Sequence, residues 1–165
     1  KLDILVNNAG VLLTGNLFVT NSTTVSDKDV KETFQTNLFS VISLTQALLP
    51  LIKKSDAGRI VNVSTILSSL TLHTTENSPI APAKEFAYNA SKTALNAFTI
   101  HLALELKDTN IKVNSGHPGW VKTELGGPNA PMEVKDSYET SLYLATLDKD
   151  GPSGGLFHKE ETLPW

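Results

Sequence analysis

The sequence predicts an α/β protein with a doubly wound parallel sheet. Short apolar segments of strand length alternate with long segments whose apolar residues recur at helical spacing, and neither a repeat nor a linker divides the chain. Its 165 residues, 40% of them hydrophobic and 19% charged, suit one domain with one core. Because helices long enough to cross back over the sheet separate the strands, neighbouring strands are expected to run parallel.

The predicted strands are short runs rich in β-branched and apolar residues. They are Ile4–Val6, Arg59–Ser64, Ile111–Asn114 and the final pair Leu156-Phe157. In sheets of this kind, ligands bind beyond the carboxyl ends of the strands. Candidate functional residues are therefore expected directly after each strand and at the start of the helix that follows it.

The predicted helices begin and end at recognisable signals. Ser26 is an N-cap residue followed by the acidic Asp27 and Asp29, which favours a helix over about 27–49 with Pro50 near its end. Further helices are expected over about 86–107 and 132–147, with a loop over about 71–85. The apolar stripe of the first helix is predicted to comprise Val30, Phe34, Val41, Leu44 and Leu48.

Composition excludes several classes of function. A net charge of -3 and a pI near 5.8 argue against a nucleic acid or an anionic membrane as partner. The chain has no cysteine, which excludes disulfides, thiolate catalysis and cysteine-ligated zinc, and no metal site is predicted. The longest apolar run, about 47–52, contains Pro50 and is too short to cross a bilayer. A soluble, cytoplasmic protein with a small-molecule partner is expected.

Tyr88 and Lys92 are four residues apart at the start of the second long helix, so they share one face. A free phenol ionises near pH 10, and a nearby ammonium group favours the phenolate and lowers that pKa. The pair is thus suited to acid chemistry near neutral pH. A tyrosine with a solvated lysine one turn later is the simpler alternative, and the spacing alone does not decide between them.

Asn37 lies on the apolar stripe of the first helix, where a buried amide requires hydrogen-bonding partners. Ser64 and Thr65 follow the second strand, where a hydroxyl can donate to a carbonyl oxygen whose charge grows on reduction. Segments 7–10, Asn-Asn-Ala-Gly, and 117–123, His-Pro-Gly-Trp-Val-Lys-Thr, end the first and third strands. Helix packing, strand-end capping and ordinary turns are the structural alternatives for these residues.

These motifs occur together in a fixed order: Asn-Asn-Ala-Gly, Asn37, Asn62-Val63-Ser64-Thr65, Tyr88-Asn89-Ala90-Ser91-Lys92, and Pro118-Gly119 to Thr123. In this order and spacing, the chain resembles the short-chain dehydrogenase/reductase family over nearly its whole length. Segments 118–123 and 151–157 are most similar to the carbonyl reductases. The resemblance implies a Rossmann-like fold and an oxidoreductase that uses NADP, with NAD not excluded, to reduce a ketone, aldehyde or quinone or to run the reverse reaction.

The resemblance also implies roles for individual residues. Tyr88 would be the general acid, Lys92 would lower its pKa and bind the nicotinamide ribose, and Asn37 would hold a water in a proton relay. The orienting hydroxyl would be Thr65 where the family has serine, with Ser64 just before it, and a branched side chain there is stiffer. The cofactor would also be bound by Asn8, Ala9 and Gly10 on its adenosine side and by Pro118, Gly119, Val121 and Thr123 at the nicotinamide.

One part of the family pattern is missing from the chain. The glycine-rich turn that holds the pyrophosphate is absent, so residues 1–165 are interpreted as the C-terminal portion of a single Rossmann-like domain. About 80 further residues, two to three strand-helix units, are expected before Lys1. The strand Ile4–Val6 is then expected to form an unpaired edge. Pairing of two copies through the long helices would make a homo-oligomer.

Two other functions remain open at this point. A non-catalytic truncated homologue, acting as a binding or interaction module, is favoured by the missing cofactor turn and by Thr65. The presence of Tyr88, Lys92 and Asn37 disfavours it. An isomerase or epimerase on a related scaffold also uses tyrosine and lysine with a bound dinucleotide, but the full motif set favours the reductase.

Overall fold

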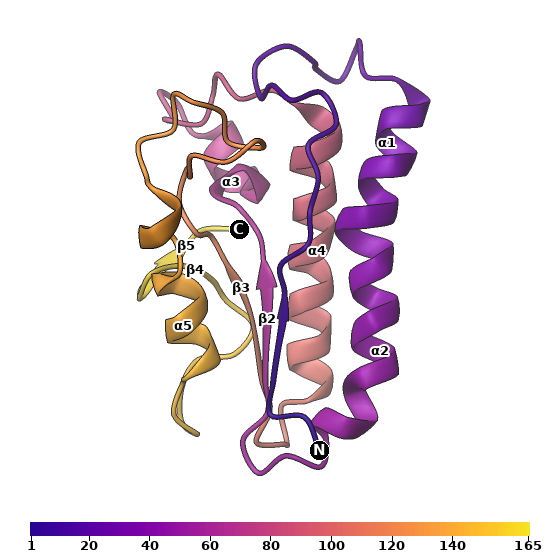
Figure 1. The fold of residues 1–165 in the computed structure, drawn as a ribbon, viewed down its shortest axis with the longest axis vertical. Coiled ribbons are helices and arrows are strands. Elements are labelled where there is room, and N and C mark those ends of the chain that lie inside the picture. The colour runs from indigo at the N-terminus through magenta and orange to yellow at the C-terminus, as the bar shows by residue number, and fades with distance from the viewer.

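A five-stranded sheet forms the centre of the computed structural model, which describes all residues from 1 to 165 (Figure 1). Its strands lie in sequence order: β1 (Ile4–Asn7), β2 (Arg59–Val63), β3 (Lys112–Gly116), β4 (Leu156–His158) and β5 (Glu161–Leu163). The first four strands are parallel, and β5 returns antiparallel to β4. The predicted parallel α/β sheet is confirmed, and β1 lies at its edge as expected. The short hairpin strand β5 was not predicted.

Helices cover both faces of this sheet (Figure 1). A continuous helical run comprises α1 (Asp27–Phe34), the π-helical turn η1 (Gln35–Phe39) and α2 (Ser40–Ile52), and it packs with α4 (Phe86–Glu105) on one face. The helix α5 (Glu139–Ala145) covers the other face. The doubly wound arrangement follows from strands with apolar residues on both sides.

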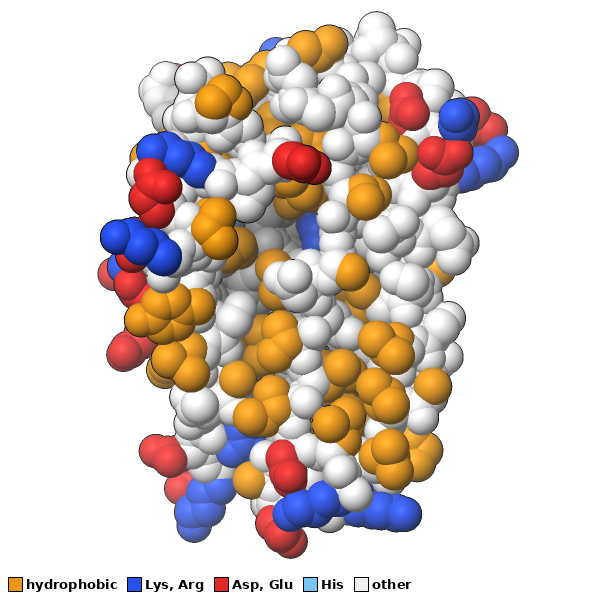
Figure 2. Space-filling model, viewed as in Figure 1, with side chains coloured by type: hydrophobic (Ala, Val, Ile, Leu, Met, Phe, Trp, Pro, Cys, Tyr) orange, Lys and Arg blue, Asp and Glu red, His pale blue; other side chains and the backbone are white.

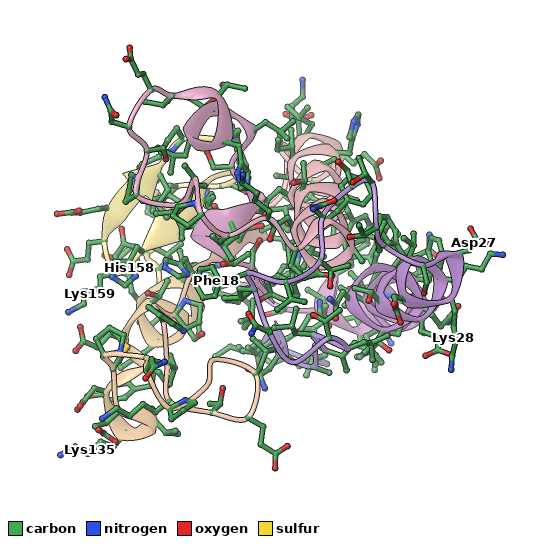
Figure 3. The ribbon with its side chains drawn as sticks, turned by 90° about the horizontal axis from the view of Figure 1, so that it is seen from above. Phe18, Asp27, Lys28, Lys135, His158 and Lys159 are labelled. Atoms are coloured by element: carbon green, nitrogen blue, oxygen red, sulfur yellow. The ribbon has the colours of Figure 1, made fainter.

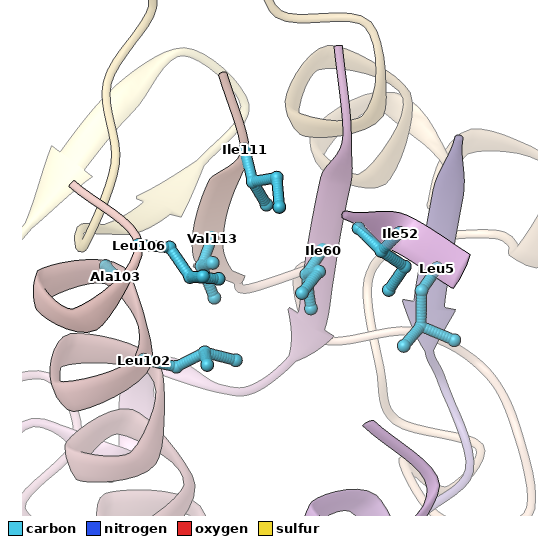
Figure 4. Packing of buried hydrophobic residues seen from close by; sticks show 8 residues of the cluster. All are labelled: Leu5, Ile52, Ile60, Leu102, Ala103, Leu106, Ile111 and Val113. Atoms are coloured by element: carbon cyan, nitrogen blue, oxygen red, sulfur yellow. The ribbon is translucent and has the colours of Figure 1, made fainter. Parts of the chain in front are cut away.

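The main apolar cluster lies between the sheet and the lower half of α4 (Figure 4). Alternate strand residues point to this side, so Leu5, Ile60 and Val113 meet Leu102 and Leu106 of α4. On the opposite side, a smaller cluster joins the sheet to α5. Its members are Val61, Leu144, Leu147 and Phe157.

The π-helical turn shifts the register of the first long helix. Thr33 faces inward before the turn, Asn37 and Leu38 do so within it, and Val41 and Thr45 do so after it. A π turn adds one residue to the helical repeat, so the inward face moves by one position. The predicted stripe is therefore wrong for Leu44, whose side chain is 49% exposed.

The helical run Asp27–Ile52 is long and apolar enough, by length and composition, to cross a membrane. The apolar segment at about 47–52, which by itself is too short to cross a bilayer, forms only the last part of α2. Core helices of water-soluble proteins also meet this criterion of length and composition. Here the run packs along α4, with the amide of Asn37 fully buried between them.

Two predicted elements differ from the structure. The expected loop over 71–85 contains part of a short helix, α3 (Leu70–Thr74), whose N-cap Ser69 accepts a hydrogen bond from the Leu72 amide. The expected helix over 132–147 is reduced to α5 and the 3₁₀ turn Val134–Asp136. Met132 instead forms a parallel β-bridge with Val121, which prevents a helix from starting there.

Candidate active site

A cavity opens at the carboxyl ends of β1, β2 and β3, the edge where the sequence places the site. Its volume is about 660 Å³, within the usual range for small-molecule sites. Segments that follow these three strands form its walls together with the first turns of α4. Figure 2 shows the hollow with a lysine or arginine side chain inside it, and Lys92 is the only such residue in the lining.

Tyr88 lies in the first turn of α4 and lines the cavity. Its side chain is buried, and its phenol lies beside the hydroxyl of Thr65. Burial raises the pKa of Tyr88 to about 12, the nearby Thr65 hydroxyl opposes this, and the Glu85 carboxylate adds to it. Lys92 is not among the groups that shift this pKa, so the lowering expected of it stays a prediction.

Lys92 lies one helical turn after Tyr88 and lines the same cavity, as the spacing predicts. Its Nζ atom donates to the carbonyl oxygen of Val63 at 2.8 Å, at the end of β2. It forms no ion pair, and burial lowers its pKa to about 8. An ammonium group has three N–H donors, so two remain for a ligand.

Asn37 is fully buried in the π turn and joins three parts of the site. Its amide nitrogen donates to the Val11 carbonyl oxygen and to the Ser91 hydroxyl, both at 3.0 Å, and its Oδ1 accepts from the Val11 amide at 2.8 Å. The side chain therefore fixes the segment after β1 to α4. Both of its N–H donors are used, which leaves only Oδ1 to accept a further hydrogen bond.

The two hydroxyls after β2 have different surroundings. The Ser64 hydroxyl donates to Asn96 Oδ1 at 2.8 Å and also lies 3.3 Å from the Ser68 hydroxyl. It thus belongs to a buried network that ties the strand end to α4. The Thr65 hydroxyl lies beside the phenol of Tyr88 and accepts from the Leu67 amide. Of the two, Thr65 is the hydroxyl placed beside the phenol.

The remaining predicted binding residues also gather here, with one exception. Asn8, Gly10, Pro118, Gly119, Val121 and Thr123 all line the cavity, whereas Ala9 is exposed and does not. A Cβ atom at Gly10 would lie 3.3 Å from Lys92 Nζ and 3.4 Å from Asn37 Oδ1. Glycine there brings the backbone close to both groups. Gly119 has φ +103, a conformation that other residues rarely adopt.

His117 was singled out only as the start of a strand-end segment, yet it lines the cavity. Its ring centroid lies 5.0 Å from that of His158. Burial and the neighbouring His158 lower the pKa of His117 to about 4, so it is neutral at physiological pH.

The outer part of the cavity is apolar, a feature the sequence analysis did not identify. Phe18, after β1, and Trp120, after β3, meet edge to face with centroids 6.5 Å apart. Figure 3 looks down on this end of the molecule and shows Phe18 over its middle, away from Asp27 and Lys28 at the start of α1. Other apolar lining residues are Leu17, Leu67, Pro79, Ile80, Pro82, Ala83 and Leu125.

A polar stripe on the buried face of α4 also went unrecognised. Ser91 bonds to Asn37, Asn96 bonds to Ser64, and Thr99 accepts from the Asn62 side chain. The signal was present in the sequence, because Tyr88, Lys92, Asn96 and Thr99 recur at helical spacing. Polar side chains on the face of a helix that packs against a sheet are a sequence signal that the helix carries functional residues.

A parallel sheet with tyrosine, lysine and a buried asparagine at its carboxyl edge defines an α/β protein of the dinucleotide-binding type. Comparison with known proteins gives the family. Residues 1–133 match the family model described as short chain dehydrogenase. The chain therefore belongs to the short-chain dehydrogenase/reductase family.

Several of the similar proteins are named carbonyl reductases. Carbonyl reductase [NADPH] 1 of Mus musculus is 30% identical over 99% of this chain and 70% of its own length. C-signal of Myxococcus xanthus is also 30% identical, over 99% of this chain and 93% of its own length. The structure of carbonyl reductase Sniffer of D. melanogaster has a TM-score of 0.81 and 32% identity, covering 98% of this chain and 66% of that one. The chain thus spans about two thirds of the reductases it resembles.

Proposed function

We propose that this chain carries the catalytic part of an NADPH-dependent oxidoreductase that reduces a carbonyl compound to an alcohol. The observation that carries the proposal is the convergence of Tyr88, Thr65 and Lys92 on one cavity. Relatives named carbonyl reductase [NADPH], and a carbonyl reductase structure from chicken fatty liver with NADPH bound, support the choice of cofactor and reaction.

Tyr88 is the proton donor in this proposal. Its raised pKa keeps the phenol protonated at neutral pH, so a proton is held at Oη for a carbonyl oxygen that gains negative charge. Thr65, whose hydroxyl lies beside the same phenol, is the second donor to that oxygen. Two donors beside one oxygen position also orient the substrate. Ser64 supports the strand end and does not contact the substrate.

Residues around the inner cavity suit a nicotinamide nucleotide. Gly10 lets the backbone approach the base of the cavity, and Lys92 retains two N–H donors that a ribose can accept. Asn8 would bind on the adenosine side, and Pro118, Gly119, Val121 and Thr123 at the nicotinamide, whereas Ala9 has no place in the cavity lining. A reduced nicotinamide, when bound, supplies the hydride.

Lys92 and Asn37 form the proton path behind the phenol. Asn37 Oδ1 and Lys92 Nζ lie on the same side of Gly10, and a water held between them would connect Tyr88 to solvent. Asn37 can offer such a water only an acceptor, because its N–H groups are occupied.

The cavity walls restrict the substrate. No Asp, Glu or Arg lines the cavity, and Lys92 is its only charged side chain. The outer walls are apolar and include the Phe18–Trp120 pair. An uncharged, apolar ketone, aldehyde or quinone therefore fits better than a keto acid, whose carboxylate would lose its hydration against the apolar outer walls.

The test is an assay of the intact protein for NADPH oxidation with pairs of carbonyl compounds. Each pair matches a neutral aryl ketone or quinone with an analogue that carries a carboxylate. We expect turnover of the neutral compounds, a higher kcat/KM with NADPH than with NADH, and a loss of kcat/KM for the charged partners. No oxidation of either nucleotide with any carbonyl compound would overturn the proposal.

A further inference from the structure

Glu85 is a buried acidic residue that none of the roles above uses. It lies three residues before Tyr88, is 2% exposed, and takes part in no ion pair. Its side-chain Oε2 accepts a hydrogen bond from the Tyr88 amide at 2.5 Å. Glu85 is thus the N-cap of α4.

This cap differs from the others in the chain. Ser26 caps α1 and Ser69 caps α3, each through a neutral hydroxyl. Small residues such as serine, threonine, aspartate and asparagine are the preferred N-caps, and glutamate is not among them. Only the helix that carries Tyr88 is capped by a longer carboxylate, held away from water, where a neutral oxygen would satisfy the same amide.

The surroundings of Glu85 connect it to the whole site. Its backbone amide donates to the Leu17 carbonyl oxygen at 3.3 Å, in the segment that lines the apolar part of the cavity. The adjacent turn is held by Asn89, whose side chain donates to the Ala83 carbonyl oxygen at 2.9 Å. Movement at Glu85 would therefore shift both Tyr88 and the cavity wall.

We propose that Glu85 is a positioning residue for Tyr88, acting through the cap that fixes the first turn of α4 and through the charge of its carboxylate on the Tyr88 amide. The inference rests on the proposed function, since it assigns the residue that tunes the proton donor of that reaction. In a buried setting, a negative charge within one helical turn disfavours the phenolate, because like charges repel strongly where water is excluded.

Other titratable groups near the pair do not replace this effect. Asp29 approaches Glu85 from α1, and together with burial it raises the pKa of Glu85. Lys92 and His117 line the cavity with Tyr88; His117 is neutral, since its pKa is lowered to about 4. Glu85 is the group whose charge raises the pKa of Tyr88, after burial itself.

The charge and the cap can be separated by substitution. Glu85→Gln keeps an oxygen that accepts from the Tyr88 amide and removes the charge, whereas Glu85→Ala removes both. The matched control is Glu105→Gln, which removes an exposed carboxylate at the far end of the same helix. A purely structural role would leave the pH dependence of Glu85→Gln equal to that of the control.

The experiment measures kcat/KM for carbonyl reduction against pH in the intact protein and titrates phenol ionisation by ultraviolet absorbance, with Tyr88→Phe as the blank. We expect Glu85→Gln to move the alkaline limb of the profile and the phenol titration to lower pH by about half a unit. Glu85→Ala should lose about fivefold in kcat as well. An unchanged profile and titration in Glu85→Gln would overturn the inference even if Tyr88 proves essential. Turnover that does not need Tyr88 would instead overturn the proposed function, and the absorbance titration tests Glu85 independently of turnover.

Discussion

The two ends of α4 differ in their role: the C-terminal half stabilises the fold, and the N-terminal half carries side chains of the site. At the C-terminal half, Leu102 and Leu106 pack on Ile60 and Val113 in a purely apolar cluster (Figure 4). At the N-terminal half, Lys92 and Asn96 of the same helix face the same sheet and are buried with polar partners. One end gains from burial, and the other places groups whose burial is unfavourable unless every hydrogen bond is made.

The contrast between the two ends of α4 shows how the fold positions the reactive side chains. Packing at the apolar end fixes the distance between α4 and the sheet. That distance brings Tyr88 and Lys92 of α4 close to Thr65, which follows β2. Substitutions at the apolar end should reduce stability and leave the site intact, whereas substitutions at the polar end should affect activity. The predictions below test that division.

The largest effect on stability is expected at the apolar end. Ile60→Ala should lower the free energy of unfolding by about 2–5 kcal/mol, because Ile60 is fully buried and a cavity would remain. Chemical denaturation measures the loss. The kcat of the folded enzyme should equal that of the unsubstituted protein, and a parallel fall in kcat would show that the two ends are not separable.

Lys92→Met should have the opposite effect on stability. The folded-state pKa of Lys92, about 8, lies below its ordinary value of 10.5, so burial of the charge is unfavourable below pH 8 and the penalty disappears as pH rises to 10.5. The substitution should therefore raise stability at pH 7 by up to about 3 kcal/mol and abolish activity. Its advantage should shrink between pH 8 and pH 10.5. A stability difference between the two proteins that stays constant from pH 8 to pH 10.5 would show that burial of the Lys92 charge does not cause it.

Asn37→Ala tests the polar network between the helices. It leaves the Val11 amide and carbonyl groups and the Ser91 hydroxyl without their partner, which should lower the free energy of unfolding by about 1–3 kcal/mol. Activity should fall as well, because the segment next to Lys92 loses its anchor. Gln35→Ala, at an exposed position in the same π turn, is the control and should change neither.

The smallest effects separate the two hydroxyls after β2. Thr65→Val keeps the shape and removes the hydroxyl beside the phenol, so kcat should fall about tenfold; the lost hydrogen bond from the Leu67 amide should also lower the free energy of unfolding by about 1 kcal/mol. Ser64→Ala breaks the network with Asn96 and should lower the free energy of unfolding by a similar amount, but with kcat nearly unchanged. The reverse assignment of effects would place Ser64, and not Thr65, at the substrate.

Much of the fold could be predicted because it depends on local pattern. Apolar strand runs separated by helical periodicity determine a parallel sheet, and four strands and both long helices occur where the sequence indicates. The misplacement of Leu44 has a cause that periodicity cannot detect, since the π turn adds a residue without a sequence signal of its own. Met132 was wrongly assigned to a helix. Its pairing with Val121 is a tertiary contact, which the local sequence pattern does not reveal.

The candidate site was predicted in its composition but not in its electrostatics. Residue spacing placed Tyr88 and Lys92 on one face, and the structure brings them together with Thr65 in one cavity. Whether a pKa rises or falls depends on burial, which the spacing does not reveal. For Tyr88, loss of hydration dominates and the pKa rises. Glu85, three residues before it, showed no sign in the sequence of being a buried cap.

The central claim, that the phenol of Tyr88 delivers the proton, is tested most directly by Tyr88→Phe in the intact protein. Two quantities are needed from the same sample: kcat for reduction of a neutral ketone, and the dissociation constant for NADPH from fluorescence titration. The account predicts that kcat falls by about 10²–10⁴-fold while NADPH binding is retained, because phenylalanine fills the same space without a proton to give. Undiminished turnover in this variant would contradict the account.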